Sequence, residues 1–163
     1  MRRFGGSFLG SSAGSAAAEM ALILPLVLTL LLTMFEGGYY LWSEHKVVKG
    51  VRDAARYAGR LDFSNYNCGT NAFTGNLAAV QNLARTGQLS GGTAKVPGWV
   101  DGNVTVSVSC VASTGGLYSS VGGNAPRVTV AAVVNYPSLF GTLGYFTSSA
   151  RLRASAQSPV VGL

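Results

Sequence analysis

The sequence predicts an α+β protein in which one long N-terminal helix leads into a small head with a short helix and an antiparallel sheet of about three strands. Three patterns favour this class: an uninterrupted apolar run over residues 20–35, a helical repeat of apolar side chains over residues 43–61, and stretches after residue 100 in which apolar and polar residues alternate. Only 11% of the 163 residues are charged, compared with about a quarter in soluble domains. Part of the chain is therefore predicted to lie in a non-aqueous environment.

The apolar run is the candidate membrane span. It reads MALILPLVLTLLLTMF from Met20 to Phe35, between Glu19 and Glu36. A bilayer core needs about 20 apolar residues, so small residues before the run and interfacial aromatic residues after it are expected to complete a transmembrane helix over residues 15–42. A cleaved secretory signal is the alternative, but its small-residue site would follow the run, whereas Ala-Ala-Ala precedes it here. The interfacial aromatic residues are Tyr39, Tyr40 and Trp42.

Residues 43–61 are predicted to continue the helix as an amphipathic segment. At 1.5 Å per residue, a helix from Ser15 to Leu61 would be roughly 70 Å long, so only its first part fits in a bilayer. The second part is expected to pack its apolar face on the head and to expose its charged face. The apolar face consists of Val47, Val48, Val51, Ala54, Ala55, Ala58 and Leu61, and the charged face of Lys49, Arg52, Asp53, Arg56 and Arg60.

Residues 62–163 are predicted to form the head. Residues 62–75 are rich in turn formers and are predicted to be a loop. The stretch from Asn76 to Gly87 predicts a helix of two to three turns that ends at the glycine. Its predicted apolar face is Leu77, Val80, Leu83 and Ala84. Strands are predicted at residues 104–110, 127–136 and 150–160, with a flexible connection over residues 113–126.

The two cysteines, Cys68 and Cys110, lack the Cys-x-x-Cys spacing of a zinc or thioredoxin-type site. A disulfide is the natural hypothesis if the head lies in an oxidising compartment, and it would close a loop of roughly 40 residues, worth about 3–4 kcal/mol in the chain-entropy account. The alternative is a pair of buried free thiols.

The charged residues argue against nucleic-acid binding and against catalysis. The net charge is +6, but five of the twelve Lys and Arg residues lie in residues 43–61, and no basic strip with interleaved aromatic residues follows. Beyond the long helix only Asp62 and Asp101 are carboxylates, and the single His45 lies beside Lys46 on an exposed helix. The Gly-rich runs lack the Lys-Ser/Thr of a phosphate loop. We predict a protein that is not an enzyme, has no cofactor or metal, and binds no nucleic acid.

Glu19 is an unusual residue for the head of an apolar helix. A carboxylate near the centre of a bilayer costs about 2.5–3.5 kcal/mol, and less near the interface, so such a residue is usually paired or functional. If a peptidase cuts after Gly14, Ser15 becomes a new N-terminus, and its amine can meet Glu19 of a neighbouring chain. The alternative is a boundary carboxylate that reaches the headgroups. Pro25 removes one backbone hydrogen bond and is expected to kink the helix.

The stretch GSAAAEMALILP, from Gly14 to Pro25, resembles the processing motif of type IV prepilins, and especially that of TadE-like proteins from tight-adherence (Tad) pilus systems. The Gly, Glu and Pro of the motif all fall in register, although Met20 stands where an aromatic residue often follows the Glu. Farther along, VRDAARYA over residues 51–58 is similar to the Ala-Ala-Arg segment that ends the long helix of the family.

The resemblance implies a minor pilin or pseudopilin that acts in the assembly, priming or anchoring of a Tad pilus. Prepilin peptidase would remove the leader, residues 1–14, by cutting between Gly14 and Ser15, and Glu19 and Pro25 would contact other subunits in the membrane. The implied partners are other pilins or pseudopilins, the peptidase, the pilus assembly platform and membrane lipid.

The implied location is the inner (cytoplasmic) membrane, with the N-terminus cytoplasmic and the head extracytoplasmic. The positive-inside rule points the other way, because five Lys and Arg residues follow the span within about 20 residues and two precede it. Ten residues separate Phe35 from the first of those five, and the five are interleaved with carboxylates, so the orientation with the N-terminus inside is retained. The alternative function is a bitopic membrane protein that presents a binding head and never polymerises.

Overall fold

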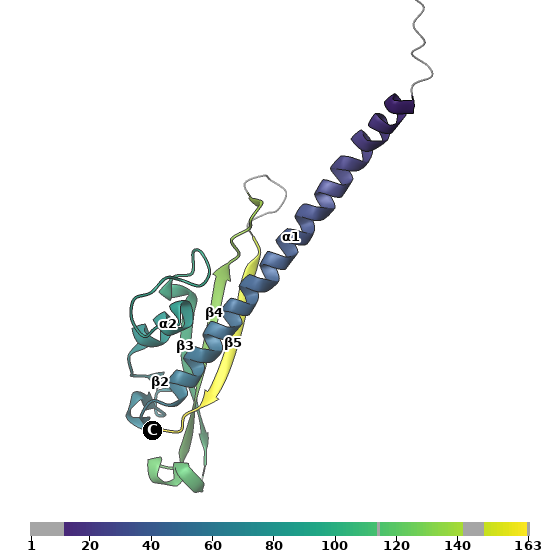
Figure 1. The fold of residues 1–163 in the computed structure, drawn as a ribbon. Coiled ribbons are helices and arrows are strands. Elements are labelled where there is room, and N and C mark those ends of the chain that lie inside the picture. The colour runs from purple at the N-terminus through teal and green to yellow at the C-terminus, as the bar shows by residue number, and fades with distance from the viewer. Residues whose placement is uncertain (1–11, 114, 142–148, 163) are drawn as a thin grey trace, which may run out of the picture. The chain divides into compact units, whose positions relative to one another are not determined.

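The computed structural model describes residues 12–113, 115–141 and 149–162 (Figure 1). The chain divides into two units, one ending at Gly38 and the other running from Tyr39 onward, and helix α1 (Ser12–Gly59) belongs to both. The helix begins inside the stretch predicted as leader and ends two residues before the predicted end. The predicted α+β class, with a long N-terminal helix, a short helix and antiparallel strands, is confirmed.

The second unit contains the end of α1, one short helix and two small antiparallel sheets. Strand β4 lies in the centre of the larger sheet, whose order is β3-β4-β5 (Figure 1). The short helix is α2 (Leu77–Thr86), the larger sheet consists of β3 (Val104–Ala112), β4 (Asn124–Asn135) and β5 (Arg151–Pro159), and the smaller one of β1 (Tyr66–Asn67) and β2 (Ala72–Phe73).

The core of this unit forms where the apolar face of α1 meets one face of the larger sheet. Strand β4 alternates buried and more exposed residues, as the predicted period of two requires. The charged face of the helix, by contrast, is exposed at Lys49, Arg52 and Arg56. The amphipathic pattern predicted for residues 43–61 is therefore confirmed. The fully buried aliphatic residues include Val47, Val51, Ala54 and Ala58 of the helix and Val128, Val130, Val134 and Leu152 of the sheet.

The chain after β5 returns to the end of the long helix. Val160 is fully buried, and its N–H donates to the carbonyl of Pro126 at 3.0 Å. The N–H of Val161 donates to the carbonyl of Gly59 at 2.8 Å, which supplies a partner for one of the orphan carbonyls at a helix C-terminus. Gly59 leaves no room for a side chain, because a Cβ there would meet Ser158 and Pro159. The helix end and the strand end are thus in close contact.

Helix α2 has the predicted ends but a different buried face. Asn76 caps its start, with Oδ1 accepting from the N–H of Ala79 at 3.1 Å, and Gly87 ends it in the left-handed region at φ 86°. The prediction that Leu77 lies on the buried face is wrong, since Leu77 is exposed and Asn82 is buried. The Asn82 amide donates to the carbonyls of Gln88 and Gly91 at 2.9 and 2.8 Å. The helix therefore turns a polar side chain inward to hold the loop that follows it.

The loop predicted over residues 62–75 contains regular structure. Strands β1 and β2 pair within it, with Tyr66 opposite Phe73 and their ring centroids 5.5 Å apart. Cys68 lies in the connecting turn, where Asn71 adopts φ 50°. Two-residue strands are too short to show a period, which is why the sequence pattern concealed them.

Strand β4 starts at Asn124, three residues earlier than predicted, and so includes Pro126. The preceding connection also holds a 3-10 turn over Gly116–Val121. The Pro126 carbonyl accepts from Val160 on the β5 side, and in an antiparallel strand the nitrogen of a residue faces the same side as its carbonyl. The Pro126 nitrogen therefore faces away from β3, and its missing N–H removes no bond to that strand. It also removes no bond of the β4–β5 ladder, because that ladder begins only at Arg127.

Gly50→Ala should destabilise the second unit by about 1–3 kcal/mol, the usual cost of overpacking. A Cβ at Gly50 would collide with the Ala84 carbonyl of α2 and would lie 3.0 Å from Cη2 of the buried Trp99. Gly37→Ala is the matched control, because no atom lies within 4 Å of a Cβ there. Thermal unfolding should show a lower Tm for Gly50→Ala and an unchanged or higher Tm for the control, and equal effects would contradict the close packing of α1 on α2.

Candidate functional site on the N-terminal helix

The part of α1 that precedes the second unit exposes nearly all of its large apolar side chains. Leu22 is 80% exposed and Met34 is 75% exposed. Among the described residues one helix, Gly14–Gly59, is long and apolar enough to cross a membrane. A continuous apolar surface of this kind fits contact with lipid or with other apolar helices. Its exposed members are Met20, Leu22, Ile23, Leu24, Leu26, Val27, Leu28, Leu30, Leu31, Met34 and Phe35.

The two hydroxyl residues within the apolar run have partners inside the helix. Thr29 Oγ1 donates to the carbonyl of Pro25 at 2.8 Å, and Thr33 Oγ1 donates to the carbonyl of Thr29 at 2.8 Å. Both bonds reach four residues back, a common arrangement for Thr in an apolar helix. Neither hydroxyl therefore presents an unpaired donor to surrounding lipid.

The predicted processing residues lie on exposed helix. Ser15 Oγ and Glu19 Oε1 are 3.5 Å apart, one helical turn from each other, so Ser15 and Glu19 share one side of α1. Pro25 lies within the same helix. Because it follows Glu19 by six residues, it is turned by about 120° around the axis, and one straight neighbouring helix does not meet both at the same face.

The family model described as TadE-like protein matches residues 14–56. This segment is TadE-like. The match starts at Gly14 and ends at Arg56, so it includes the whole motif from Gly14 to Pro25 and the Ala-Ala-Arg of the second motif, and the resemblance is confirmed. Residues 57–163 lie outside the match, and no curated protein and no solved structure matches the chain.

The TadE-like segment implies a pilin-like protein associated with a Tad pilus and with other components of that pilus. The family is not known for enzymatic activity, and the single apolar N-terminal helix fits a single-pass membrane protein. Within the described ranges, no three His, Cys, Asp or Glu side chains are grouped so as to hold a metal ion. His45 is exposed beside a shallow hollow of about 260 Å³ that Glu44, Val48 and Arg52 also line.

A disulfide fastens the smaller sheet to the larger one. Cys68 in the β1–β2 turn is bonded to Cys110 in β3, with Cα atoms 5.6 Å apart, and the predicted bridge is confirmed. The bridge spans a sequence separation of 42 residues, for which the chain-entropy account gives about 3–4 kcal/mol of stabilisation.

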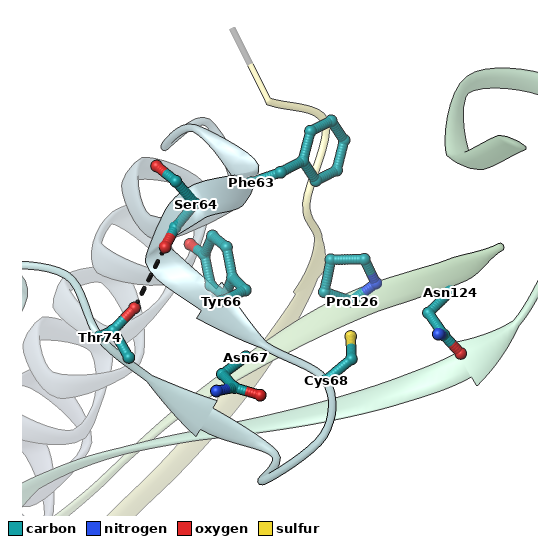
Figure 2. Close-up of a pocket in the computed structure, with 8 residues that line it drawn as sticks. All are labelled: Phe63, Ser64, Tyr66, Asn67, Cys68, Thr74, Asn124 and Pro126. Atoms are coloured by element: carbon teal, nitrogen blue, oxygen red, sulfur yellow. Dashed lines mark hydrogen bonds between the residues drawn. The ribbon is translucent and has the colours of Figure 1, made fainter. Parts of the chain in front are cut away.

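A hollow of about 360 Å³ lies beside this bridge (Figure 2). Thr74 Oγ1 donates to the carbonyl of Ser64 at 3.2 Å across it, and the Tyr66 hydroxyl donates to the carbonyl of Ala58 in α1. The described lining offers no carboxylate, imidazole or amine, so it supplies no general acid or base near neutral pH. The hollow could not be predicted from the sequence because much of its lining lies in the stretch predicted as loop. The lining is Phe63, Ser64, Tyr66, Asn67, Cys68, Thr74, Asn124 and Pro126.

Alkaline pH should weaken the second unit through Tyr66. Burial, with a smaller effect of nearby Tyr57, raises the pKa of Tyr66 from 10.0 to about 12. The folded form therefore holds this proton more tightly, and the stabilisation is complete below pH 10 and lost as the pH rises from 10 towards 12. We expect a loss of at most about 2–3 kcal/mol, at 1.36 kcal/mol per pKa unit.

Chemical unfolding measured across this pH range would test the effect, with Tyr66→Phe as the control. The variant loses the hydrogen bond to Ala58 and should be less stable at pH 8, by about 1 kcal/mol. Its stability should fall less than that of the wild type between pH 10 and 12. Parallel pH curves for the two proteins would contradict this role of the Tyr66 proton.

Proposed function

We propose that this chain is a minor pilin or pseudopilin that acts in the assembly, priming or anchoring of a Tad-type pilus. The observation that carries the proposal is the TadE-like match over residues 14–56, on a helix whose apolar side chains are exposed and whose first turns bear Glu19. An exposed apolar helix attached to a folded head suits a subunit that lies in a bilayer and can pass into a helical bundle of similar subunits.

In this proposal prepilin peptidase cuts between Gly14 and Ser15. The new amine at Ser15 then pairs with Glu19 of a neighbouring subunit, which offsets the cost of a carboxylate in apolar surroundings. Within one chain, the contact between Ser15 and Glu19 is long, at 3.5 Å, so an intermolecular ammonium group would be the stronger partner for Glu19.

The proposed orientation puts the N-terminus in the cytoplasm and the second unit outside the inner membrane. The bridge between Cys68 and Cys110 supports this orientation, because disulfides persist in oxidising compartments and are rare in the cytosol. The basic residues Arg2 and Arg3 would remain with the cytoplasmic leader.

Shearing of fibres from cells tests the proposed role. The chain should either appear in the sheared fraction together with the fibre subunits, or its deletion should lower the fibre yield while leaving the other subunits expressed. Glu19→Ala should reproduce the defect, and Thr33→Ala, a polar position in the same helix, should not. A chain that stays wholly in the membrane fraction and whose deletion leaves fibres unchanged would instead be the bitopic binding protein.

A further inference from the structure

The excess positive charge of this protein is concentrated in the unit that starts at Tyr39. Of the twelve Lys and Arg residues only Arg2 and Arg3 precede it, and of the six carboxylates only Glu19 and Glu36 do. The ten cations and four carboxylates that remain give this unit the whole net charge of +6. A unit with this excess attracts anionic partners.

The face of the larger sheet that points away from the core carries three arginines and no carboxylate. The strand register sets Arg151 opposite Asn135 at one end of this face, with Arg153 two residues farther along β5. It sets Arg127 opposite Ser109 at the other end. All three arginines are exposed, and no salt bridge engages them within the described residues. Their charges are available to a ligand.

The Arg151 end of this face holds a hollow of about 400 Å³. Its polar groups are one guanidinium, two carboxamides and one hydroxyl. The nearest carboxylate in the sequence, Asp101, pairs with Arg85, whose Nε lies 2.8 Å from Oδ1. A single arginine among neutral donors matches a singly charged phosphate diester. The lining residues are Gly102, Asn103, Thr105, Val133, Asn135 and Arg151.

This hollow lies at the end of the sheet that adjoins the first residues of the second unit. Tyr136 follows β4 directly, and its N–H donates to the carbonyl of Ala150, the residue before β5, at 3.0 Å. The Tyr136 ring centroid lies 6.0 Å from that of Tyr39 and 5.1 Å from that of Tyr40. Only three residues separate Tyr39 from Phe35, where the apolar run ends. If that run spans a bilayer, the chain therefore leaves the apolar layer within a few residues of Tyr39.

The neighbouring helix turn has the side chains of a membrane interface. Trp42 is 53% exposed, and Nζ of Lys46 lies 3.2 Å from its ring centroid. Aromatic rings with basic side chains over them are favoured at the headgroup level. The field of an anionic surface is screened beyond about 8 Å at physiological salt, so Arg151 would respond to headgroups only at short range.

We propose that the hollow at Arg151 binds the phosphate-diester headgroup of an anionic phospholipid such as phosphatidylglycerol. Arg151 supplies the positive charge, and the amides of Asn103 and Asn135 supply neutral donors. A bound headgroup would hold the second unit against the bilayer surface by a contact separate from the helix itself. This inference rests on the membrane span of the proposed function.

Hydrogen exchange of the full chain in nanodiscs tests the site. The discs contain phosphatidylcholine alone or phosphatidylcholine with phosphatidylglycerol, and the readout is the exchange of amides in residues 132–136 and 150–153. Phosphatidylglycerol should slow this exchange several-fold, and high salt should reverse the slowing. Arg151→Gln should abolish the dependence on phosphatidylglycerol. The matched control Arg127→Gln, on the same face at the far end, should retain it.

Equal exchange of the wild-type chain in both kinds of disc would overturn the proposal, as would an equal loss in Arg127→Gln, which would indicate a general charge effect. Thermal unfolding checks that both variants are folded, and Arg151→Lys, which keeps the charge but not the planar guanidinium, should show a partial response.

Slowed exchange with added inorganic phosphate in phosphatidylcholine discs, without a response to phosphatidylglycerol, would refute the lipid as ligand. A chain that fails to enter nanodiscs refutes the span and the proposed function together, whereas a chain that enters and ignores phosphatidylglycerol refutes this inference alone.

Discussion

Gly14→Arg should leave the full-length chain uncleaved in the membrane. A long charged side chain at the proposed cut prevents the close approach of the backbone to the peptidase that Gly allows. The substitution should not disturb folding, because no atom lies within 4 Å of a Cβ at Gly14. An accumulated precursor would therefore report on processing, and its expected extent is a complete or nearly complete block. N-terminal sequencing and intact mass of protein from its native host give the measurement.

Glu19→Ala separates processing from assembly in the same experiment. The Gly14–Ser15 bond is unchanged in this variant, so cleavage should continue, whereas entry into an assembly should fall because the partner of the new amine is missing. If the wild-type protein keeps Met1 and is fully functional, cleavage is not required. The proposal of a pilin or pseudopilin would then lose its main mechanism.

Val51→Asp should prevent the second unit from folding stably. Val51 is fully buried among the aliphatic core residues, and a carboxylate there would have no described partner. The loss of packing and the burial of an unpaired charge should together cost more than about 4 kcal/mol. Arg56→Gln, five residues farther along on the exposed face, should change the stability by less than about 0.5 kcal/mol.

Limited proteolysis and thermal unfolding of the full chain in detergent would measure both effects. Val51→Ala provides an intermediate control, since it removes methyl groups without adding charge and should cost about 1–3 kcal/mol. Similar and severe destabilisation by Val51→Asp and Arg56→Gln would contradict the assignment of the two faces of α1.

The features that could be predicted from the sequence are those with a long regular pattern. The apolar run and the helical spacing of Val47, Val51 and Ala54 specify α1. Any other secondary structure would expose these apolar side chains to water. The alternation of Val104, Val106 and Val108 specifies β3 for the same reason. The motif from Gly14 to Pro25 could also be predicted from the sequence because its residues are contiguous in the chain.

The remaining features depend on contacts between residues far apart in the chain. Asn82 is buried because its amide meets the carbonyls of a loop, and no helical pattern contains that information. The β1–β2 ribbon is held by the hydrogen bond from Tyr66 of β1 to the Ala58 carbonyl of α1 and by a disulfide to β3, and its own two-residue strands contribute little. The hollow at Arg151 is formed by three separate segments, so the sequence shows its members but not that they meet.

The return of the chain to Gly59 has a consequence for the order of folding. Residues 160 and 161 bond to the end of α1 and extend the pairing of β4 with β5 by one residue, yet they are made about a hundred residues after the helix they complete. The helix can form and enter a membrane long before these contacts are possible, and the bridge to Cys110 can close as soon as β3 is available. The valine and alanine stripe of α1 therefore stays uncovered until β4 and β5 are made, and an exposed apolar stripe of this kind favours aggregation during biosynthesis.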